Sequence, residues 1–404
     1  MCTATRGCSL SSASASPSAR ATRARRQRVP GLWQGVRWAL ARDAGGGGTS
    51  RLRLAWRALR ATLGEGKALR RWMGVVYELR SREVVRDAAG EYLRAIRPYV
   101  NRNTRFSERV VQLVDHMDWL ETAFGPAAFT QVASGEPLVL AELTPPRGYD
   151  FMRLQLRQAP PQSPEGEMLL TLTLRRSAEL QHKPQPIDAG VLAFSRFRIE
   201  GTACLVIGGV RGQRDPVQRV SPVEVSHALQ GWKPAVFLVR VAQELARYWA
   251  LKLVGLDPAA HRLHGWSYRW SRRYRDAGEK IFASYRALWD HFEARNGPAG
   301  WVILPLDTDE KLAATHLSPE KRARQARRAD YWIRTRNQLR AQFRKLLQRP
   351  GMEPRLDRIT QALTPSGNMP LDEFDGPESG SSLSDDDFIP SRVLETGPGV
   401  LDDD

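Results

Sequence analysis

Residues 204–253 read CLVIGGVRGQRDPVQRVSPVEVSHALQGWKPAVFLVRVAQELARYWALKL, and this stretch decides the fold. The apolar run Cys204–Ile207 predicts a short buried strand, which the glycine pair 208–209 would end. Arg211 and Gly212 follow and open a polar loop. The stretch therefore begins as a strand that leads through a glycine turn into a loop.

A long helix is predicted after this loop. Pro222 suits the first turn of a short helix that carries His227, and residues 230–232 interrupt it. Pro234 suits the first position of the longer helix, where its missing N–H is not needed. The apolar stripe of the longer helix consists of Leu238, Ala242, Leu245, Trp249 and Leu253.

A strand that delivers a loop onto a helix N-terminus is a recurrent way of holding an anionic group. Free backbone N–H groups and the positive end of the helix dipole meet there. The turn at Arg211 and the loop before Pro234 are the candidate positions in this chain. The alternative is a strand–loop–helix packing unit without a ligand, because glycine turns beside helices are common.

The charge of the chain is unevenly distributed. The 404 residues carry 61 Lys and Arg against 44 Asp and Glu, a formal charge of +17. Residues 366–404 hold 11 acidic residues and one Arg, so the rest of the chain has 60 basic and 33 acidic residues, or +27. A basic body favours an anionic ligand. We expect residues 351–404 to be a disordered acidic tail that can contact the basic closing helix.

Several classes of protein are disfavoured by composition. No run approaches 18 apolar residues, and the N-terminal residues hold no apolar core of a secretory signal, so we expect a soluble, cytoplasmic protein without a transmembrane segment. The 3 cysteines form no disulfide framework, and the 7 His residues show no ligand spacing. We expect no metal. The sequence does not indicate an oligomeric state.

The chain divides by composition into four parts. Residues 1–50, rich in Ser, Arg and Gly, predict a disordered leader. Residues 51–135 have a helical period, with Ser107 as an N-cap and a first apolar stripe of Leu52, Trp56, Leu59 and Leu63. Residues 136–350 predict an α/β domain that ends in a basic helix, and residues 351–404 form the tail.

The α/β part opens with strands. Short apolar runs, several of them alternating, are separated by Pro/Gly turns as in an antiparallel meander. These runs are Leu138–Leu143, Phe151–Leu156, Met168–Leu174 and Val191–Phe197. After the strand–loop–helix unit we expect a helix near Ser284–Ala294 and a strand at Trp301–Leu304. The predicted fold class is α+β, with N-terminal helices followed by a mixed, mostly antiparallel sheet flanked by helices.

Two basic segments are candidates for a partner. Residues 261–292 interleave aromatic residues with Arg, which suits stacking on single-stranded nucleic acid; the alternative is an edge strand with a buried aromatic face. The closing helix, Pro319–Arg349, has 11 Lys and Arg against 2 Asp and Glu. Its basic face suits nucleic acid, anionic lipid or the acidic tail, and a solvated charged face is the alternative. Its candidate nucleic-acid-binding residues are Arg324, Arg327, Arg328 and Arg334.

Conventional catalytic motifs are missing. The sequence has no GxSxG elbow, no GxxxxGK[ST] loop and no HExxH. Titratable or hydroxyl groups near the proposed anion site are Glu224, His227, Tyr285, Asp290 and His291. A single His in such a place is more often a structural hydrogen-bonding group than a base.

Five segments, taken in order, resemble the VirK/YbjX family of bacterial proteins, a domain of unknown function. They are Ile207–Gly212, Gly231–Pro234, Tyr285–Trp289, Leu304–Pro305 and Ser318–Trp332, and the likeness covers roughly residues 70–350. The family is associated with virulence, envelope maintenance and resistance to cationic antimicrobial peptides. The resemblance implies a bacterial cytoplasmic protein and names no reaction.

The order of elements more distantly resembles the GCN5-related N-acyltransferases (GNAT). That family has a meander, a core strand, a glycine-containing loop at a helix N-terminus, a strand, a helix and a final strand. Its loop N–H groups hold the pyrophosphate of acyl-CoA, and a Tyr on the later helix often serves as general acid. Trp289 stands at the corresponding position here, one helical turn after Tyr285.

This resemblance implies an acyl-CoA site and a possible acyltransferase. Its cofactor-binding candidates are Arg211, Gly212, Gln230, Gly231, Trp232 and Lys233. Tyr285 is the candidate acid, and His227 is the second catalytic candidate. The alternative function is a nucleic-acid-binding regulator without catalytic activity.

Overall fold

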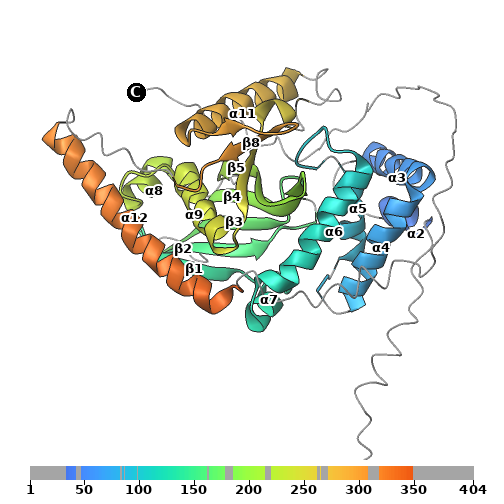
Figure 1. Ribbon diagram of the computed structural model, residues 1–404, viewed down its shortest axis with the longest axis horizontal. Coiled ribbons are helices and arrows are strands. Elements are labelled where there is room, and N and C mark those ends of the chain that lie inside the picture. The colour runs from blue at the N-terminus through green and yellow to red at the C-terminus, as the bar shows by residue number, and fades with distance from the viewer. Residues whose placement is uncertain are drawn as a thin grey trace, which may run out of the picture.

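The computed structural model describes residues 33–41, 47–81, 84–85, 87–97, 99–161, 163–177, 185–213, 220–261, 264, 272–307 and 318–348. A sheet lies in the middle of the molecule, with the N-terminal helices at one end and the C-terminal helix at the other (Figure 1). The α+β class predicted from the sequence is therefore confirmed.

Ten α-helices and one short 3-10 helix lie in the described residues. They are α2 (Trp33–Ala41), α3 (Gly47–Gly64), α4 (Gly66–Ser81), α5 (Ala88–Ile96), α6 (Phe106–Ala123), α7 (Pro126–Ala133), α8 (Pro222–Ala228), α9 (Pro234–Tyr248), η1 (Pro258–Ala260), α11 (Arg272–His291) and α12 (Pro319–Leu346).

Eight strands form one sheet in the order β1-β2-β3-β4-β5-β6-β8-β7. They are β1 (Leu138–Leu143), β2 (Tyr149–Gln158), β3 (Met168–Arg176), β4 (Ile187–Ile199), β5 (Thr202–Gly212), β6 (Lys252–Leu256), β7 (Arg295–Asn296) and β8 (Trp301–Leu304). β5 and β6 are parallel, and the other neighbouring pairs are antiparallel. The chain crosses from β5 to β6 through α8 and α9.

Strand β5 does not end at its first two glycines. Ala193 pairs with Gly209 and Phe194 with Ile207, so Gly208 is the extra residue of a β-bulge. A Cβ at Gly208 would lie 2.1 Å from the carbonyl oxygen of Glu165. The expectation of a turn at this point was therefore wrong, because close approach of a distant loop requires the glycine.

Helix α9 packs on the sheet through the stripe predicted for it, with one correction. Leu238, Ala242 and Leu245 are completely buried. The helix ends at Tyr248, so Leu253 belongs to β6 and not to the helix. A Cβ at Gly190 of β4 would lie 3.2 Å from Leu238 Cδ1. The lack of a side chain at Gly190 therefore lets α9 lie close to β4.

One apolar core joins the helical region and the sheet. A continuous cluster of buried side chains runs from Trp72 in α4 to Leu347 just after α12. Helix α12 contributes Tyr331, Thr335, Leu339 and Phe343 to its buried side. Its last residues are tied to the end of α6, because Leu347 forms a β-bridge with Phe124.

The N-terminal helices require two corrections. Helix α2 and the start of α3 lie within residues 1–50, which composition assigned to a disordered leader; residues 1–32 and 42–46 are outside the described chain. Trp38 of α2 contacts the rings of Tyr77 and Tyr92, so packing against α4 and α5 orders this helix. On α3 the buried residues are Leu54, Ala55, Ala58, Ala61 and Thr62, while Trp56 and Leu63 of the predicted stripe are exposed.

Two further local expectations differ from the structure. Ser107 lies inside α6, whose N-cap is Arg105, and the carboxylate of Glu108 accepts a hydrogen bond from the Arg105 backbone N–H. The segment 261–292 is not an edge strand from residue 272 onward, because residues 272–291 form α11. The aromatic residues at 266, 268 and 270 lie outside the described residues, as does the acidic tail.

Candidate functional site at the end of strand β5

Strands β5 and β6 pair over only four residues and then separate. The pairs run from Cys204 with Lys252 to Ile207 with Gly255, whereas β5 continues to Gly212. Beyond Ile207 the outer edge of β5 therefore has no partner strand among the described residues. Side chains of helix α11 lie against β5 and β6 near the point where the two strands separate.

Tyr285 and Trp289 of α11 lie against the separating strands. The hydroxyl of Tyr285 accepts a hydrogen bond of 3.0 Å from the backbone N–H of Val210 in β5. The indole Nε1 of Trp289 donates to the carbonyl oxygen of Leu256 at 2.9 Å. The helical spacing of four residues thus places one aromatic residue on each strand, and Tyr285 reaches the unpaired edge of β5.

A buried histidine lies beside Tyr285. Its ring lies edge-on to the imidazole of His261, with 5.9 Å between centroids. His261 is 2% exposed and forms a β-bridge with Asn101. The amide Nδ2 of Asn101 donates to the carbonyl oxygen of Ala299 at 3.1 Å. The segment around Asn101 therefore closes one side of the site and holds His261 beside the candidate acid.

Glu165 and Arg211 form an ion pair on the opposite side of β5. Arg211 Nη1 lies 2.7 Å from Glu165 Oε2, and the two side chains are 26% and 13% exposed. A Cβ at Gly209 would lie 2.9 Å from the Glu165 carboxyl group. The lack of a side chain at Gly209 thus lets the Glu165 carboxylate lie against β5. A phosphate bound by Arg211, as the sequence predicts, would have to compete with this carboxylate for the guanidinium group.

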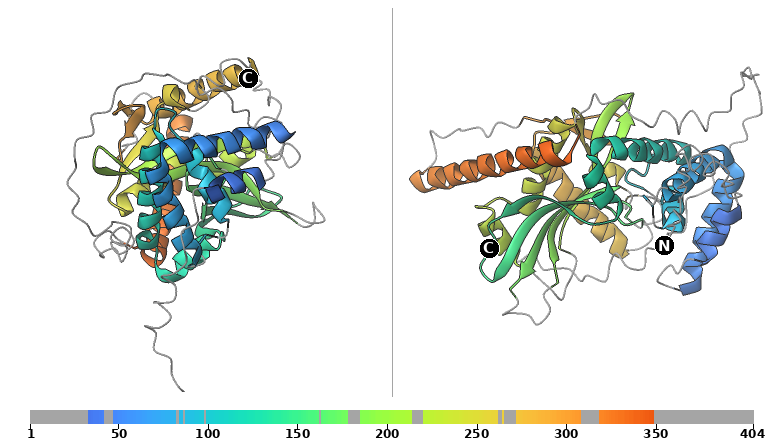
Figure 2. Two further views of the ribbon diagram at one scale, coloured as in Figure 1. Left: turned by 90° about the vertical axis from the view of Figure 1, so that its right-hand side faces the viewer. Right: turned by 90° about the horizontal axis from the view of Figure 1, so that it is seen from below.

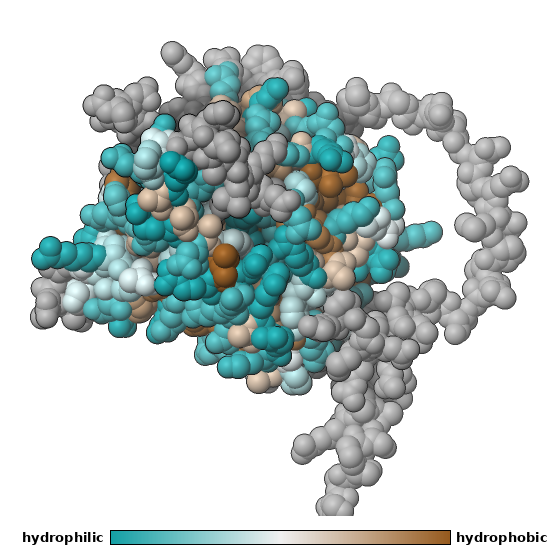
Figure 3. Space-filling view, turned by 60° about the vertical axis from the view of Figure 1, so that its left-hand side comes forward, coloured by the Kyte–Doolittle hydropathy of each residue, from teal (hydrophilic) through white to brown (hydrophobic). Residues whose placement is uncertain are grey.

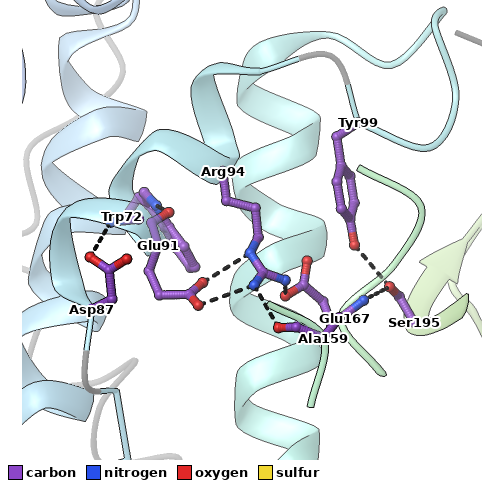
Figure 4. Close-up of polar contacts among 9 residues, drawn as sticks. Trp72, Asp87, Glu91, Arg94, Tyr99, Ala159, Glu167 and Ser195 are labelled. Atoms are coloured by element: carbon purple, nitrogen blue, oxygen red, sulfur yellow. Dashed lines mark hydrogen bonds and ion pairs between the residues drawn. The ribbon is translucent and has the colours of Figure 1, made fainter. Parts of the chain in front are cut away.

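The loop that carries Glu165 is anchored by a buried ionic network (Figure 4). Arg94 of α5 pairs with Glu91 and Glu167 and donates to the carbonyl oxygen of Ala159 at 3.2 Å. The backbone N–H of Glu167 donates to Ser195 Oγ at 3.0 Å. Because Ala159 and Glu167 lie on either side of Glu165, Arg94 fixes both ends of the loop.

Two more contacts complete the anchoring of this loop. The hydroxyls of Tyr99 and Ser195 lie 2.8 Å apart (Figure 4), and burial raises the pKa of Tyr99, so its hydroxyl stays protonated. The backbone N–H of Val100 donates to the carbonyl oxygen of Pro164 at 2.8 Å. Val100 has a φ of 44°, which is strained for a β-branched residue. The helical region thus positions the loop beside β5.

The loop before α9, the second candidate anion site, contains two consecutive residues with positive φ. Gln230 and Gly231 have φ values of 55° and 88°, so the chain turns sharply before Lys233, the N-cap. Lys233 is exposed, and its side chain does not cap the helix. The ring carbon Cβ of Pro234 would lie 3.5 Å from a Cβ at Gly190, which pairs with Gly212. The start of α9 therefore lies against Gly190, the β4 residue that pairs with Gly212.

The side chain of Trp232 is buried and serves packing. It is 3% exposed and lies near the guanidinium groups of Arg240 and Arg328, with 5.5 and 5.1 Å from ring centroid to Cζ. Its Nε1 donates to the carbonyl oxygen of Arg328 at 3.4 Å. A ligand at this loop would therefore meet backbone atoms of residue 232 and not its ring.

Helix α12 brings two predicted nucleic-acid-binding residues to the predicted cofactor loop. Arg328 Nη2 donates to the carbonyl oxygen of Gly231 at 2.6 Å. A Cβ at Gly231 would lie 3.4 Å from Arg324 Nε and 3.5 Å from Arg328 Nε. The two candidate sites, proposed separately from the sequence, thus form one basic surface around Gly231, Lys233, Arg324 and Arg328.

The remaining predicted residues lie apart from this surface or on its rim. Arg327 is exposed on α12, and Arg334 pairs with Asp330 at 2.7 Å on the solvent side of the helix. The N-terminal turns of α12 project from the body (Figure 2), and the surface seen from this side is largely hydrophilic (Figure 3). His227 is exposed on α8, whereas Tyr285 is buried against β5.

The sequence interpretation missed Glu165 and His261. Glu165 lies in a Pro/Gly-rich segment that indicates only a turn, and its role depends on two glycines more than 40 residues later. His261 stands at the start of the aromatic and basic segment, where nothing singles it out. In the described residues we find no group of three His, Cys, Asp or Glu suited to a metal, and no helix long and apolar enough to cross a membrane.

The fold and site define a mixed α+β protein with one parallel strand pair and a basic surface beside the crossover helix. The model of the family described as "Protein of unknown function (DUF535)" matches residues 49–341, more than half of the chain. The chain belongs to this family, which is the VirK/YbjX family that the sequence resembles. No curated protein and no solved structure matches the chain.

Proposed function

We propose that this protein is a cytoplasmic acyl-CoA-dependent acyltransferase with a GNAT-like arrangement that supports envelope maintenance or virulence in a bacterium. The observation that carries the proposal is the separation of the parallel strands β5 and β6, with the α9 N-terminus beside the Gly190–Gly212 pair. This order of strand, loop and helix is the one through which N-acyltransferases hold acyl-CoA.

The basic surface supplies the phosphate-binding groups. Backbone N–H groups at the start of α9 are directed toward the loop, and the helix dipole favours an anion there. Lys233, Arg324 and Arg328 add positive charge at the same loop. A pyrophosphate placed against Gly231 would meet all three side chains.

Tyr285 is the proposed general acid. Acyl transfer from a thioester releases a thiolate, and a hydroxyl held beside β5 can protonate it. The hydrogen bond from Val210 fixes the position of the Tyr285 oxygen at the separated edge of the strand. His227 is exposed on α8 and has no such anchoring, so we assign it no role in proton transfer.

Isothermal titration of the full-length protein with acetyl-CoA and longer acyl-CoAs tests this function. We expect binding that weakens about tenfold when Arg324→Ala and Arg328→Ala are combined, as for the loss of one or two charge-assisted contacts. Arg334→Ala is the matched control, because Arg334 lies on the solvent side of the same helix and pairs with Asp330. No binding at concentrations up to about 1 mM, where the free energy of binding is only about −4 kcal/mol, rejects the proposal.

A second candidate function is a nucleic-acid-binding regulator. The observation that favours it is the exposed start of α12, where Lys321, Arg322 and Arg327 are directed to solvent. This function predicts an affinity that falls with salt, with a log–log slope of about −0.7 to −0.9 per phosphate contacted. Affinity that is insensitive to salt, or unchanged by Arg327→Ala with Arg334→Ala, excludes it.

A further inference from the structure

Helices α2 and α3 repeat the same three residue types at the same spacing. Trp33, Arg37 and Leu40 lie on α2 with intervals of four and three residues. Trp56, Arg60 and Leu63 lie on α3 with the same intervals. In an α-helix these intervals place all three side chains on one face.

Both faces are directed away from the protein. The apolar members are exposed by 60% (Trp33), 46% (Leu40), 65% (Trp56) and 73% (Leu63), and both arginines are also exposed. These four are half of the large apolar side chains that are exposed in the described part of the chain.

The opposite side of each helix explains this orientation. Gly35 and Ala39 are buried on α2, and Leu54, Ala55, Ala58 and Ala61 are buried on α3. The small-residue faces therefore pack inward, and the Trp, Arg and Leu residues remain outside. The two helices form the outer layer at the end of the molecule opposite to α12 (Figures 1 and 2).

The charge on these helices has one sign. Neither α2 nor α3 contains Asp or Glu, and the first acidic residue after α3 is Glu65. Lys67 and Arg70 at the start of α4 are exposed and extend the positive charge. Two helices that expose Trp, Leu and Arg and contain no acidic residue are complementary to a surface with an apolar interior and negative head groups.

We propose that the outer faces of α2 and α3 dock the protein on a membrane surface that contains anionic phospholipid. Trp33 and Trp56 lie at the level of the head groups, Leu40 and Leu63 enter the acyl boundary, and Arg37 and Arg60 bind phosphate. Apolar insertion and attraction to the head groups together give reversible attachment without a spanning helix. This role is independent of the acyl-CoA site, which lies around β5, α9 and α12.

Vesicle co-sedimentation of the full-length protein tests the proposal. Vesicles of phosphatidylcholine alone are compared with vesicles that also contain phosphatidylglycerol. We expect sedimentation with the anionic vesicles that decreases with salt. The variant Trp33→Ser with Trp56→Ser should reduce partitioning about tenfold or more, and Arg37→Gln with Arg60→Gln about 10- to 30-fold.

The control is Ile333→Ser with Arg334→Gln on α12, where Ile333 is 46% exposed. It should sediment like the unchanged protein, and all three variants should keep the melting temperature because their side chains are exposed. Partitioning that the control variant abolishes, or that the Trp and Arg variants leave unchanged, overturns the proposal. The proposal is also overturned if the protein does not sediment with the vesicles. In that case another part of the chain, a second copy or a nucleic acid covers this face.

Discussion

Arg94 and Glu167 form an ion pair in which 1% and 0% of the two side chains are exposed to solvent. Glu91, 5% exposed, shares the same guanidinium group, so two buried carboxylates depend on one cation. Glu167 Oε1 is buried without a hydrogen-bond partner in the described part of the chain. The guanidinium group of Arg94 therefore holds the loop that carries Glu165. Because the site is buried, water cannot replace this group if it is lost.

Replacing Arg94 by Met should destabilise the protein strongly. The change keeps much of the side-chain volume but leaves two buried carboxylates without their cation, which costs about 3–5 kcal/mol of unfolding free energy. Arg153→Met is the matched control, because Arg153 pairs with Glu142 on the surface, where such pairs contribute about 0–1 kcal/mol. Urea unfolding measures both. Equal effects of the two substitutions would contradict the anchoring role of Arg94.

The two ends of the glycine-rich part of β5 should respond differently to alanine. A Cβ at Gly208 meets the Glu165 backbone at 2.1 Å, so Gly208→Ala should cost about 1–3 kcal/mol or more through overpacking. Gly212 has no atom within 4 Å of such a Cβ, and Gly212→Ala should change stability by less than about 0.5 kcal/mol. Thermal unfolding of both variants measures this difference. If Gly208→Ala leaves the melting temperature unchanged, the loop that carries Glu165 does not pack on the bulge at Gly208.

His116 makes the fold sensitive to acid. Burial, with smaller contributions from Arg94 and Arg196, lowers the pKa of His116 from 6.5 to about 3. As the pH falls, His116 is therefore protonated near pH 6.5 in the unfolded chain but only near pH 3 in the folded protein. The stabilising contribution of neutral His116 is fully present above pH 6.5 and is lost as the pH falls toward 3.

The variant His116→Asn should flatten this dependence. Asn can still accept the hydrogen bond that His116 Nδ1 accepts from the Arg196 backbone N–H, but it does not titrate. Between pH 7 and 4.5 its unfolding free energy should fall by about 2–3 kcal/mol less than that of the unchanged protein. Burial raises the pKa of Asp118 to about 6, so this carboxyl group favours the folded state as the pH falls. Asp118 is present in both proteins, so its effect cancels when their curves are compared. Parallel curves for the two proteins would refute the role of His116.

Tyr285→Phe should separate catalysis from binding. If Tyr285 is the acid, the rate of acyl transfer should fall about 10²- to 10⁴-fold while affinity for acyl-CoA stays within a few-fold. The partly buried Val210 N–H loses its acceptor, so unfolding free energy should also drop by about 1 kcal/mol. Tyr248→Phe, which removes a hydroxyl bonded to the Leu347 carbonyl, is the control with unchanged rate. An unaltered rate in Tyr285→Phe would remove this residue from the mechanism.

Local patterns were sufficient to predict most elements. Alternation and turn residues predicted the four meander strands within a few residues, and β1 and β8 with the bounds that the structure has. The basic closing helix starts at the predicted Pro319 because Ser318 caps it and Pro suits its first turn. These signals lie within a few residues of the element that they define.

The parts that could not be predicted depend on distant contacts. Gly208 resembles a turn residue unless the carbonyl of Glu165 is known to approach it. The stripe of Trp56 and Leu63 has the period of a buried face, yet the small residues on the other side of α3 pack more closely. The meeting of Gly231 with Arg324 and Arg328 joins residues about 90 positions apart, and no spacing in the sequence indicates it.

The attachment of α12 beside β1 has a consequence for how this chain is made. Helix α12 contacts β1, an edge strand, and is the last described helix; the Phe124–Leu347 bridge fixes the residue that follows it. Until residue 347 has left the ribosome, a nascent chain exposes the apolar side chains that Leu339 and Phe343 cover, and exposed apolar surface promotes aggregation. Products of premature termination before Pro319 should therefore aggregate, and the protein reaches its native state only when almost all of its described length has been synthesised.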